Sequence, residues 1–176
     1  MIDRPQAERL IAGRLSQRRC EHAQRVAAVA AQLARRYGAS PEAAEIAGLL
    51  HDFCRELTDA ETLAAAARYG IEVGPVEARR PRKILHGPVA AAELREAGLD
   101  ADSAAAIARH TTGGPGMTVL EKCLYLADFC EPGRAFPGLD EAVAAAARIS
   151  LLDLIGRGRG VVPDALALYN ETYAGT

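Results

Sequence analysis

The chain has 176 residues, a length that fits one ordinary domain with a single substantial core. Its formal net charge is only −2, with 21 basic and 23 acidic residues mixed along the chain, which excludes the strongly basic character of a typical nucleic-acid-binding domain. The four cysteines form no CxxC pair and lie in or beside apolar helical patterns, so reduced thiols are favoured over a disulfide framework.

The first stretch, MIDRPQAERLIAGRLSQ, is amphipathic and carries acidic residues and arginines. It lacks the unbroken apolar core of a signal peptide, and no later segment has the ~20 apolar residues that a membrane span needs. We therefore expect a cytoplasmic protein that binds a small ligand, with no nucleic-acid or membrane partner.

Helical periodicity begins early in the chain. After His22, apolar residues recur at helical spacing until Gly38, which is a suitable stop: Val26, Val29, Ala30 and Leu33. Ser40 and Pro41 then form an N-cap and first turn of a second helix, which reaches His51 and Asp52.

Two capping boxes mark later helix starts, Thr58-x-x-Glu61 and Thr118-x-x-Glu121. The pattern predicts further helices at about 84–97, 103–110, 139–155 and 163–173, separated by glycine, proline or aspartate. No alternating strand pattern of any length and no repeat of 20–50 residues is present. The sequence predicts one compact all-α domain over residues 1–176.

The stretch AGLLHDF runs from apolar residues directly into a histidine and an aspartate, which are costly to bury. The chain has four histidines, each on or at the end of a different predicted helix: His22, His51, His86 and His110. One such histidine is more often a hydrogen-bonded core residue than a ligand. Four of them, with Asp52 and Asp128 also beside apolar residues, are best explained by bound cations.

Imidazoles combined with carboxylates suit iron, manganese, cobalt or zinc, whereas magnesium prefers oxygen ligands. Six such side chains can hold two metal ions, and a carboxylate can bridge two ions about 3.5–4 Å apart. Asp52 is our candidate for the bridge.

The ordered constellation H…HD…H…H…D resembles the HD-domain metal-dependent phosphohydrolases. The segment HTTGGPGMTVLEKCLYLADFCEPGRAFPGLDE, together with AGLLHDF and YNETY, is similar to the bacterial YqeK-type HD proteins over nearly the whole chain. This resemblance implies an HD-domain helical bundle that cleaves diadenosine tetraphosphate symmetrically to two ADP, with a dinuclear centre of iron. Manganese, cobalt and zinc remain alternatives from the type of ligands.

The resemblance also implies site residues. The residues that match the metal ligands of the family are His22, His51, Asp52, His86, His110 and Asp128. Among these we assign catalytic roles to Asp52, His86 and His110. The residues that match the signature around the site, and that we assign to substrate binding, are Thr111, Thr112, Gly113, Glu131 and Arg134.

Three further cations are candidates for phosphate binding. Arg19 lies three residues before His22 and therefore shares its helix face. Arg55 stands where many members of the family have lysine, and it keeps the charge as a planar fork. Lys83 ends the run ARRPRK just before His86, which either steers a polyphosphate or is a solvated loop.

The expected reaction is hydrolysis of a phosphoanhydride by a metal-activated hydroxide, with arginines stabilising the developing charge. The stretch TTGGPG lacks the Lys-Ser/Thr ending of a P-loop and is interpreted as a wall of the active site, with a simple turn as the alternative. Two other functions remain open: another HD-type phosphohydrolase acting on nucleoside triphosphates, nucleoside monophosphates or an alarmone, and a nucleotide-binding regulatory module. The sequence leaves the choice between a monomer and a homodimer open.

Overall fold

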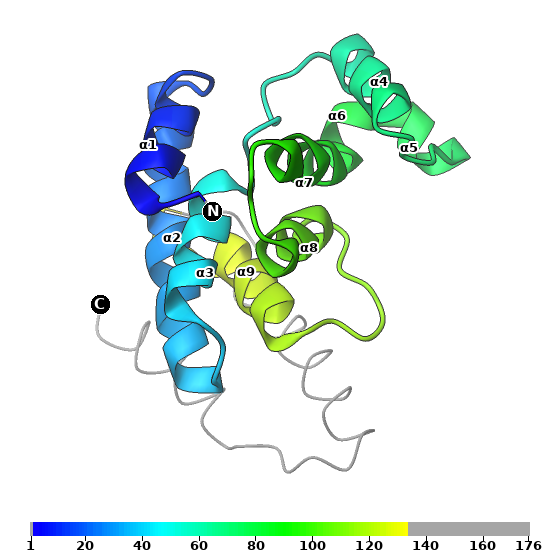
Figure 1. Cartoon of the computed structure of the whole chain (residues 1–176). Coiled ribbons are helices and arrows are strands. Elements are labelled where there is room, and N and C mark those ends of the chain that lie inside the picture. The colour runs from blue at the N-terminus through cyan, green and yellow to red at the C-terminus, as the bar shows by residue number, and fades with distance from the viewer. Residues whose placement is uncertain (1, 134–176) are drawn as a thin grey trace. The chain divides into compact units, whose positions relative to one another are not determined.

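Residues 2–133 are described by a computed structural model, and they form helices joined by short turns (Figure 1). In chain order the helices are α1 (Arg4–Ala12), α2 (Gln17–Tyr37), α3 (Pro41–Leu50), α4 (Asp59–Arg68), α5 (Pro75–Arg79), α6 (Pro81–Ile84), α7 (His86–Glu96), α8 (Ala101–Arg109) and α9 (Val119–Cys130). No strand occurs in this part of the chain, and the all-α prediction is confirmed.

The predicted caps form as expected. Gly38 ends α2 in the left-handed conformation, at φ 79°, and its N–H donates to the carbonyl of Ala34. The Ser40 side chain accepts from the backbone N–H of Ala43 at the start of α3. Reciprocal capping boxes open α4 at Thr58 and α9 at Thr118, so local sequence determines these three helix starts.

Two predicted boundaries were wrong. The helix expected from residue 84 begins at His86, because Pro88 has no N–H for the carbonyl of Ile84 and fits only in a first turn. The helix expected from residue 103 begins at Ala101, because the Asp100 side chain caps it by accepting from the N–H of Ser103. Helices α1, α5 and α6 were not predicted, and the helices predicted at 139–155 and 163–173 lie outside the described residues.

Helices α2, α3, α8 and α9 pack around one core. α2 contacts α3 and α9, while α8 contacts α3, α7 and α9 (Figure 1). The largest fully buried side chains are mostly aliphatic, and those from these helices and α7 are Val26, Leu49, Leu50, Val89, Leu94, Ile107 and Leu124. This core fixes the relative positions of the helices that carry the histidines.

Two glycines allow unusually close helix packing. A Cβ atom on Gly48 would lie 2.5 Å from the Cα of Ala27, so α3 approaches α2 backbone to backbone. A Cβ atom on Gly87 would lie 2.8 Å from the carbonyl oxygen of Ile107 and 3.1 Å from the ring of His110. Each contact brings together two of the helices that carry or end at a histidine.

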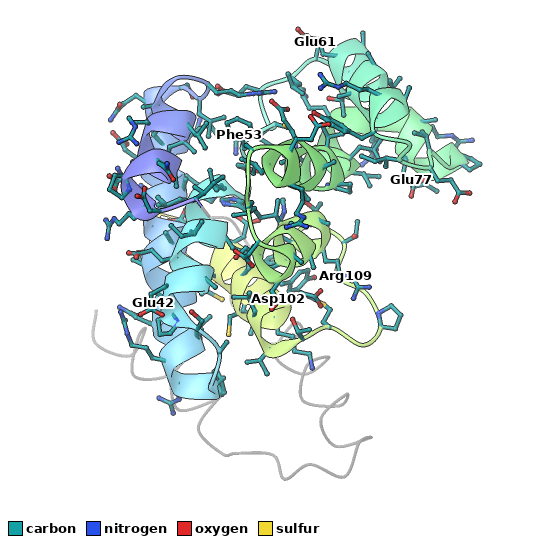
Figure 2. The ribbon with its side chains drawn as sticks, in the orientation of Figure 1. Glu42, Phe53, Glu61, Glu77, Asp102 and Arg109 are labelled. Atoms are coloured by element: carbon teal, nitrogen blue, oxygen red, sulfur yellow. The ribbon has the colours of Figure 1, made fainter. Side chains whose placement is uncertain are left out.

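Acidic side chains are exposed on three of the helices. Glu42, Glu61 and Asp102 are exposed on α3, α4 and α8 (Figure 2). Phe53, directly after the histidine–aspartate pair, is buried beneath the guanidinium of Arg14, which lies 4.4 Å from the ring centroid. Among the described residues, no helix has the length and apolar character needed to cross a bilayer.

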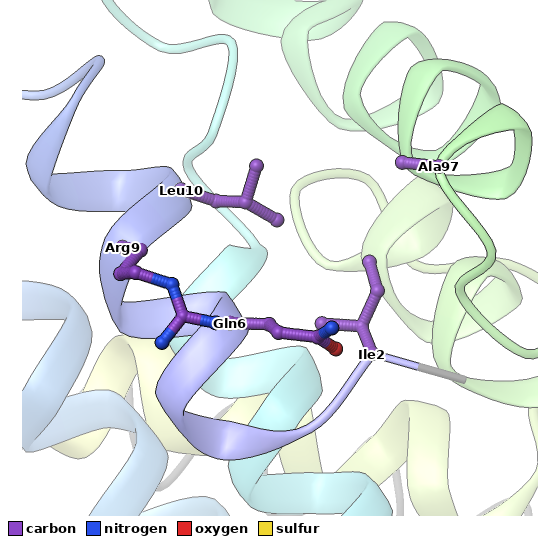
Figure 3. Close-up of a pocket in the computed structure, with 5 residues that line it drawn as sticks. All are labelled: Ile2, Gln6, Arg9, Leu10 and Ala97. Atoms are coloured by element: carbon purple, nitrogen blue, oxygen red, sulfur yellow. The ribbon is translucent and has the colours of Figure 1, made fainter.

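The described residues group into a single unit that ends at Gly133. The prediction that one domain extends to residue 176 stays a prediction. A surface hollow of about 390 Å³ is lined by Ile2, Gln6, Arg9 and Leu10 of the N-terminal segment and by Ala97 (Figure 3). It contains none of the candidate metal ligands, and it has no carboxylate among its lining residues, so it is not a candidate for metal chemistry.

Candidate metal centre

The six predicted metal ligands come from five helices and their ends. His22 lies on α2 and Asp128 on α9, while His86 is the first residue of α7. His51 and His110 are the C-cap residues of α3 and α8, and Asp52 follows His51. The structure brings them together in one cluster, in which every ligand except the half-buried Asp128 is at most 8% exposed.

Asp52 lies at the centre of this cluster, and its two oxygens face different histidines. Oδ1 is 3.2 Å from Nε2 of His86 and 3.9 Å from Nε2 of His110. Oδ2 is 3.7 Å from Nε2 of His51 and 3.9 Å from Nε2 of His22. A carboxylate with this orientation offers one oxygen to each of two neighbouring cations.

Two groups of side chains have the compactness of a metal site. In His22, His51 and Asp128, and again in His51, Asp52 and His110, one ligand atom from each residue lies within 4.8 Å of the others. In the first group, Nε2 of His22 is 3.1 Å and Nε2 of His51 is 3.7 Å from Oδ1 of Asp128. Next to the second group, Nε2 of His86 and Nε2 of His110 are 3.0 Å apart.

The hydrogen bonds of the cluster leave ligand atoms unused. Nε2 of His22 and Nε2 of His51 are buried without a hydrogen-bond partner. Orphaned buried nitrogens cost free energy unless something binds them, and a cation among carboxylates would do so. The ligand set of imidazoles and carboxylates therefore fits a first-row divalent metal.

Backbone carbonyls set the tautomer of two histidines. Nδ1 of His51 is 2.7 Å from the carbonyl oxygen of Gly48, and Nδ1 of His110 is 2.7 Å from that of Ile107. Because these contacts place the proton on Nδ1, the lone pair of Nε2 points into the cluster. Burial also lowers the pKa of His110 to about 3, so this ring is neutral and able to bind a metal at pH 7.

The carboxylate of Asp52 is ionised despite its burial. Burial by itself favours the protonated form, but His51 and the hydrogen bond with His86 outweigh it and hold the pKa of Asp52 well below its usual range. The group therefore keeps its negative charge at neutral pH.

A basic hollow opens beside this carboxylate. It measures about 390 Å³ and is lined by Arg19, Arg55, Glu56, Arg82 and Lys83. Nη1 of Arg19 is 2.8 Å from Oδ2 of Asp52, and Nε of Arg55 is 3.8 Å from Oδ1. Arg55 also donates to the carbonyl oxygen of Arg82, which ties the hollow to α6. Four cations thus line this hollow, and two of them, Arg19 and Arg55, contact Asp52.

The signature residues after His110 differ in their contacts with the cluster. Oγ1 of Thr111 is 3.1 Å from Nε2 of His110 and 3.4 Å from Nε2 of His86. Thr112 is exposed, with its hydroxyl 3.4 Å from the carbonyl of Gly113. Gly113 has φ 62°, and a Cβ atom there would meet Met117 and Tyr125. Thr111 is therefore the residue of this stretch whose side chain reaches the histidines.

Glu131 occupies a place that sequence reasoning did not foresee. It was assigned to substrate binding, but it is 2% exposed and its Oε1 lies 3.1 Å from Nδ1 of His22. Its other oxygen accepts from Arg25, which lies one helical turn after His22. Arg25 lies three residues after His22, as Arg19 lies three residues before it, so both share the helix face of His22. This spacing is the feature of the sequence from which Arg25 could have been identified. Arg134 lies outside the described residues.

The segment that carries this cluster matches a known family. Residues 19–133 match the HD domain model, and this segment contains all six clustered ligands. The chain belongs to the HD domain family. Membership of this family implies a divalent metal centre, for which the clustered histidines and carboxylates are the candidate ligands.

HD-family relatives are similar over most of the chain. A protein of Bacillus subtilis named symmetrical bis(5'-nucleosyl)-tetraphosphatase is 34% identical, over 99% of this chain and 100% of its own length. A protein of the same name from Staphylococcus aureus is 39% identical, over 77% of this chain and 70% of its own length. A third, from Halalkalibacterium halodurans, is 32% identical, over 97% of this chain and 97% of its own length.

A solved structure has the same fold. It is a crystal structure from Clostridium acetobutylicum described as a "predicted HD superfamily hydrolase involved in NAD metabolism". It is 31% identical in sequence, with a TM-score of 0.75, and the match covers 92% of each chain. The HD-type helical bundle inferred from the sequence is therefore confirmed.

Proposed function

We propose that this HD-family hydrolase cleaves diadenosine tetraphosphate symmetrically, giving two molecules of ADP. The single observation that carries the proposal is the similarity, at 32–39% identity, to three relatives named for this activity. The buried ligand cluster beside a hollow lined by cations suits hydrolysis of a polyphosphate, because cations stabilise the charge that develops on the phosphates.

We assign the metal centre as dinuclear. His22, His51 and Asp128 would hold one ion, while His86 and His110 would hold the other, and the two oxygens of Asp52 would join them. The different directions of these oxygens support this assignment. Iron is the metal we propose, from the family resemblance, with manganese, cobalt and zinc as alternatives that the same ligands accept.

When bound, the metal centre would polarise a phosphate of the substrate and lower the pKa of a water enough for it to act as a nucleophile near pH 7. The chain contributes charge and position. Arg19, Arg55, Arg82 and Lys83 face the same hollow, and charge-assisted contacts from them would bind the phosphates and stabilise charge as the anhydride breaks. Neutral His110 presents Nε2 to the cluster, and Thr111 places a hydroxyl beside it.

Symmetrical cleavage requires that one ADP half stays fixed while the other leaves. The cationic hollow beside Asp52 is our candidate for the fixed half, because its four cations come from three segments of the chain and two of them contact Asp52. Thr112 and Gly113 remain candidates for contacts to the leaving half. The cytoplasmic location, the absence of nucleic-acid and membrane partners, and the oligomeric state stay predictions.

The test is a hydrolysis assay with purified full-length protein loaded anaerobically with Fe²⁺ or with Mn²⁺. Diadenosine tetraphosphate is added, and nucleotides are separated chromatographically at an early time point. ADP as the sole nucleotide product supports the proposal, whereas equal amounts of AMP and ATP contradict it. Faster phosphate release from nucleoside triphosphates, nucleoside monophosphates or an alarmone would favour the alternative phosphohydrolase. Nucleotide binding without turnover under any metal would favour the regulatory module.

A further inference from the structure

Glu131 is a buried carboxylate that contacts one histidine of the metal cluster and none of the residues that line the cationic hollow. It directly follows α9, and its side chain is 2% exposed. Oε1 lies 3.1 Å from Nδ1 of His22, and Oε2 accepts from Nε of Arg25 and, at 2.7 Å, from the backbone N–H of Gly133. Both oxygens of Glu131 are thus engaged by groups of the protein, and its negative charge would repel a polyphosphate. This carboxylate is therefore poorly placed to bind a negatively charged substrate.

His22 differs from the other candidate ligands in what holds its Nδ1. His51 and His110 each use a backbone carbonyl three residues earlier in their own helices. Nδ1 of His86 is buried without a hydrogen-bond partner. Among these four histidines, His22 is the one whose Nδ1 faces a side-chain carboxylate, supplied from 109 residues further along the chain.

A carboxylate on Nδ1 has two effects on a metal-binding histidine. It keeps the proton on Nδ1, so the lone pair stays on Nε2, and it increases the basicity of the ring. Nε2 of His22 is the atom that lies 3.1 Å from Asp128, within the first group of clustered ligands. The orientation of Glu131 therefore bears directly on the atom expected to bind the metal.

Arg25 and Gly133 in turn hold Glu131. Arg25 lies three residues after His22 on α2, so the same helix presents both partners to the carboxylate. A Cβ atom on Gly133 would lie 2.6 Å from Nε and Nη2 of Arg25. The absence of a side chain at position 133 thus makes room for the guanidinium.

We propose that Glu131, held by Arg25, is a positioning residue that fixes the tautomer and orientation of His22 for metal binding, and does not contact substrate. The inference rests on the ligand set proposed above and is independent of which nucleotide is hydrolysed. It predicts that loss of Glu131 weakens metal binding at the ion held by His22, with a smaller effect on the other ion.

The experiment measures Mn²⁺ binding to the full-length protein by electron paramagnetic resonance, which counts free Mn²⁺ during a titration. For Glu131→Ala we expect affinity at one of two ions to fall by about 10–100-fold, the usual effect of removing a partner behind a ligand. Glu131→Gln keeps an acceptor for Nδ1–H but not the charge, so its Mn²⁺ affinity should lie between those of Glu131→Ala and wild type. Arg25→Gln should reduce the affinity in the same direction.

The matched control is Glu121→Gln. Glu121 lies on α9 and, like Glu131, is a buried glutamate that pairs with an arginine; it is 4% exposed, and its contacts are with Arg109 and Thr118. This variant should lose some stability through its capping box, while its Mn²⁺ affinity should equal that of wild type. A second readout uses the Zn²⁺-loaded protein, in which the imidazole N–H of His22 should exchange slowly with solvent by NMR in wild type and rapidly in Glu131→Ala.

Three results would overturn the proposal. Wild-type Mn²⁺ affinity in folded Glu131→Ala would show that the carboxylate does not act on His22. A higher KM for the nucleotide with unchanged Mn²⁺ affinity would return Glu131 to substrate binding. Failure of the wild-type protein to bind Mn²⁺, Fe²⁺ or Zn²⁺ would refute the ligand set itself, and with it this role. If Glu131→Ala does not fold, Glu131→Gln and Arg25→Gln decide by the same criteria.

Discussion

The close approach of α3 to α2 at Gly48 leads to a prediction that links helix packing to metal affinity. In Gly48→Ala, the new Cβ would lie 2.5 Å from the Cα and 2.8 Å from the N of Ala27. Carbon atoms in ordinary contact are about 3.5–4.0 Å apart, so α3 must move away from α2 by about 1 Å. Both contacted atoms belong to the backbone, so no flexible side chain can absorb the change.

The magnitude follows from two opposing effects. Overpacking of this kind costs about 1–3 kcal/mol, and the higher helix propensity of alanine returns up to about 1 kcal/mol. We therefore expect a net loss in the free energy of unfolding of up to about 2 kcal/mol, or a fall in Tm of up to roughly 8 °C.

The displacement also reaches the metal ligands. The carbonyl of Gly48 accepts from Nδ1 of His51 at 2.7 Å, so a shift of the backbone at Gly48 moves His51 relative to His22 on α2. Metal–ligand distances tolerate only about ±0.2 Å. We expect the Mn²⁺ affinity of Gly48→Ala to fall by about 10-fold or more.

Thermal unfolding of the metal-free protein and titration with Mn²⁺ test both parts. The matched control is Gly13→Ala, because Gly13 has φ −80° and a Cβ atom there would lie 3.5 Å from its nearest neighbour, the carbonyl oxygen of Arg9, which is an ordinary contact. Gly13→Ala should keep or raise the free energy of unfolding, by up to about 1 kcal/mol, and bind Mn²⁺ normally. Unchanged Mn²⁺ affinity in Gly48→Ala would refute the reasoning that this helix spacing sets the ligand geometry.

Four further results are expected. Asp52→Ala should lose turnover and bind less Mn²⁺ while its far-UV circular dichroism stays like wild type, because one carboxylate faces both ligand groups; wild-type rates in a metal-replete sample would exclude this role. Arg82→Ala should raise KM for diadenosine tetraphosphate by about 5-fold, the effect of one exposed charge of about 1 kcal/mol, without changing Mn²⁺ affinity; an unchanged KM would remove Arg82 from the phosphate site. Burial raises the pKa of the Cys54 thiol to about 12, so at pH 8 its alkylation by iodoacetamide, followed by mass spectrometry, should be at least ~100-fold slower in the folded protein than in urea. Burial lowers the pKa of His110 to about 3, so below pH ~6.5 this histidine is protonated in the unfolded chain but not in the folded chain. The metal-free protein should therefore lose up to ~1.4 kcal/mol of stability per pH unit. Denaturant titrations at pH ~6.5 and ~5.5 should show a smaller loss for His110→Gln.

Local sequence was sufficient for the elements whose ends are determined by caps. Ser40, Thr58 and Thr118 each bond to a backbone N–H within three residues, so their effect can be predicted without knowing the fold. The start of α7 was predicted too early because apolar periodicity extends through Ile84, and the restriction imposed by Pro88 was not weighed against it. The short helix α5 has no buried side chain, and so no apolar stripe from which to predict it.

The sequence by itself determined which polar side chains would be buried and would therefore need a common partner. Four histidines and two aspartates beside apolar helical residues require compensation wherever the helices pack, because burying such groups unpaired is costly, and this argument needs no coordinates. The tertiary structure alone decided how they pair. The division of the Asp52 oxygens between two sets of histidines depends on how closely α2, α3, α7 and α8 approach, which Gly48 and Gly87 permit. The contact between His22 and Glu131 likewise depends on α2 lying against α9, and sequence separation carries no information about that distance.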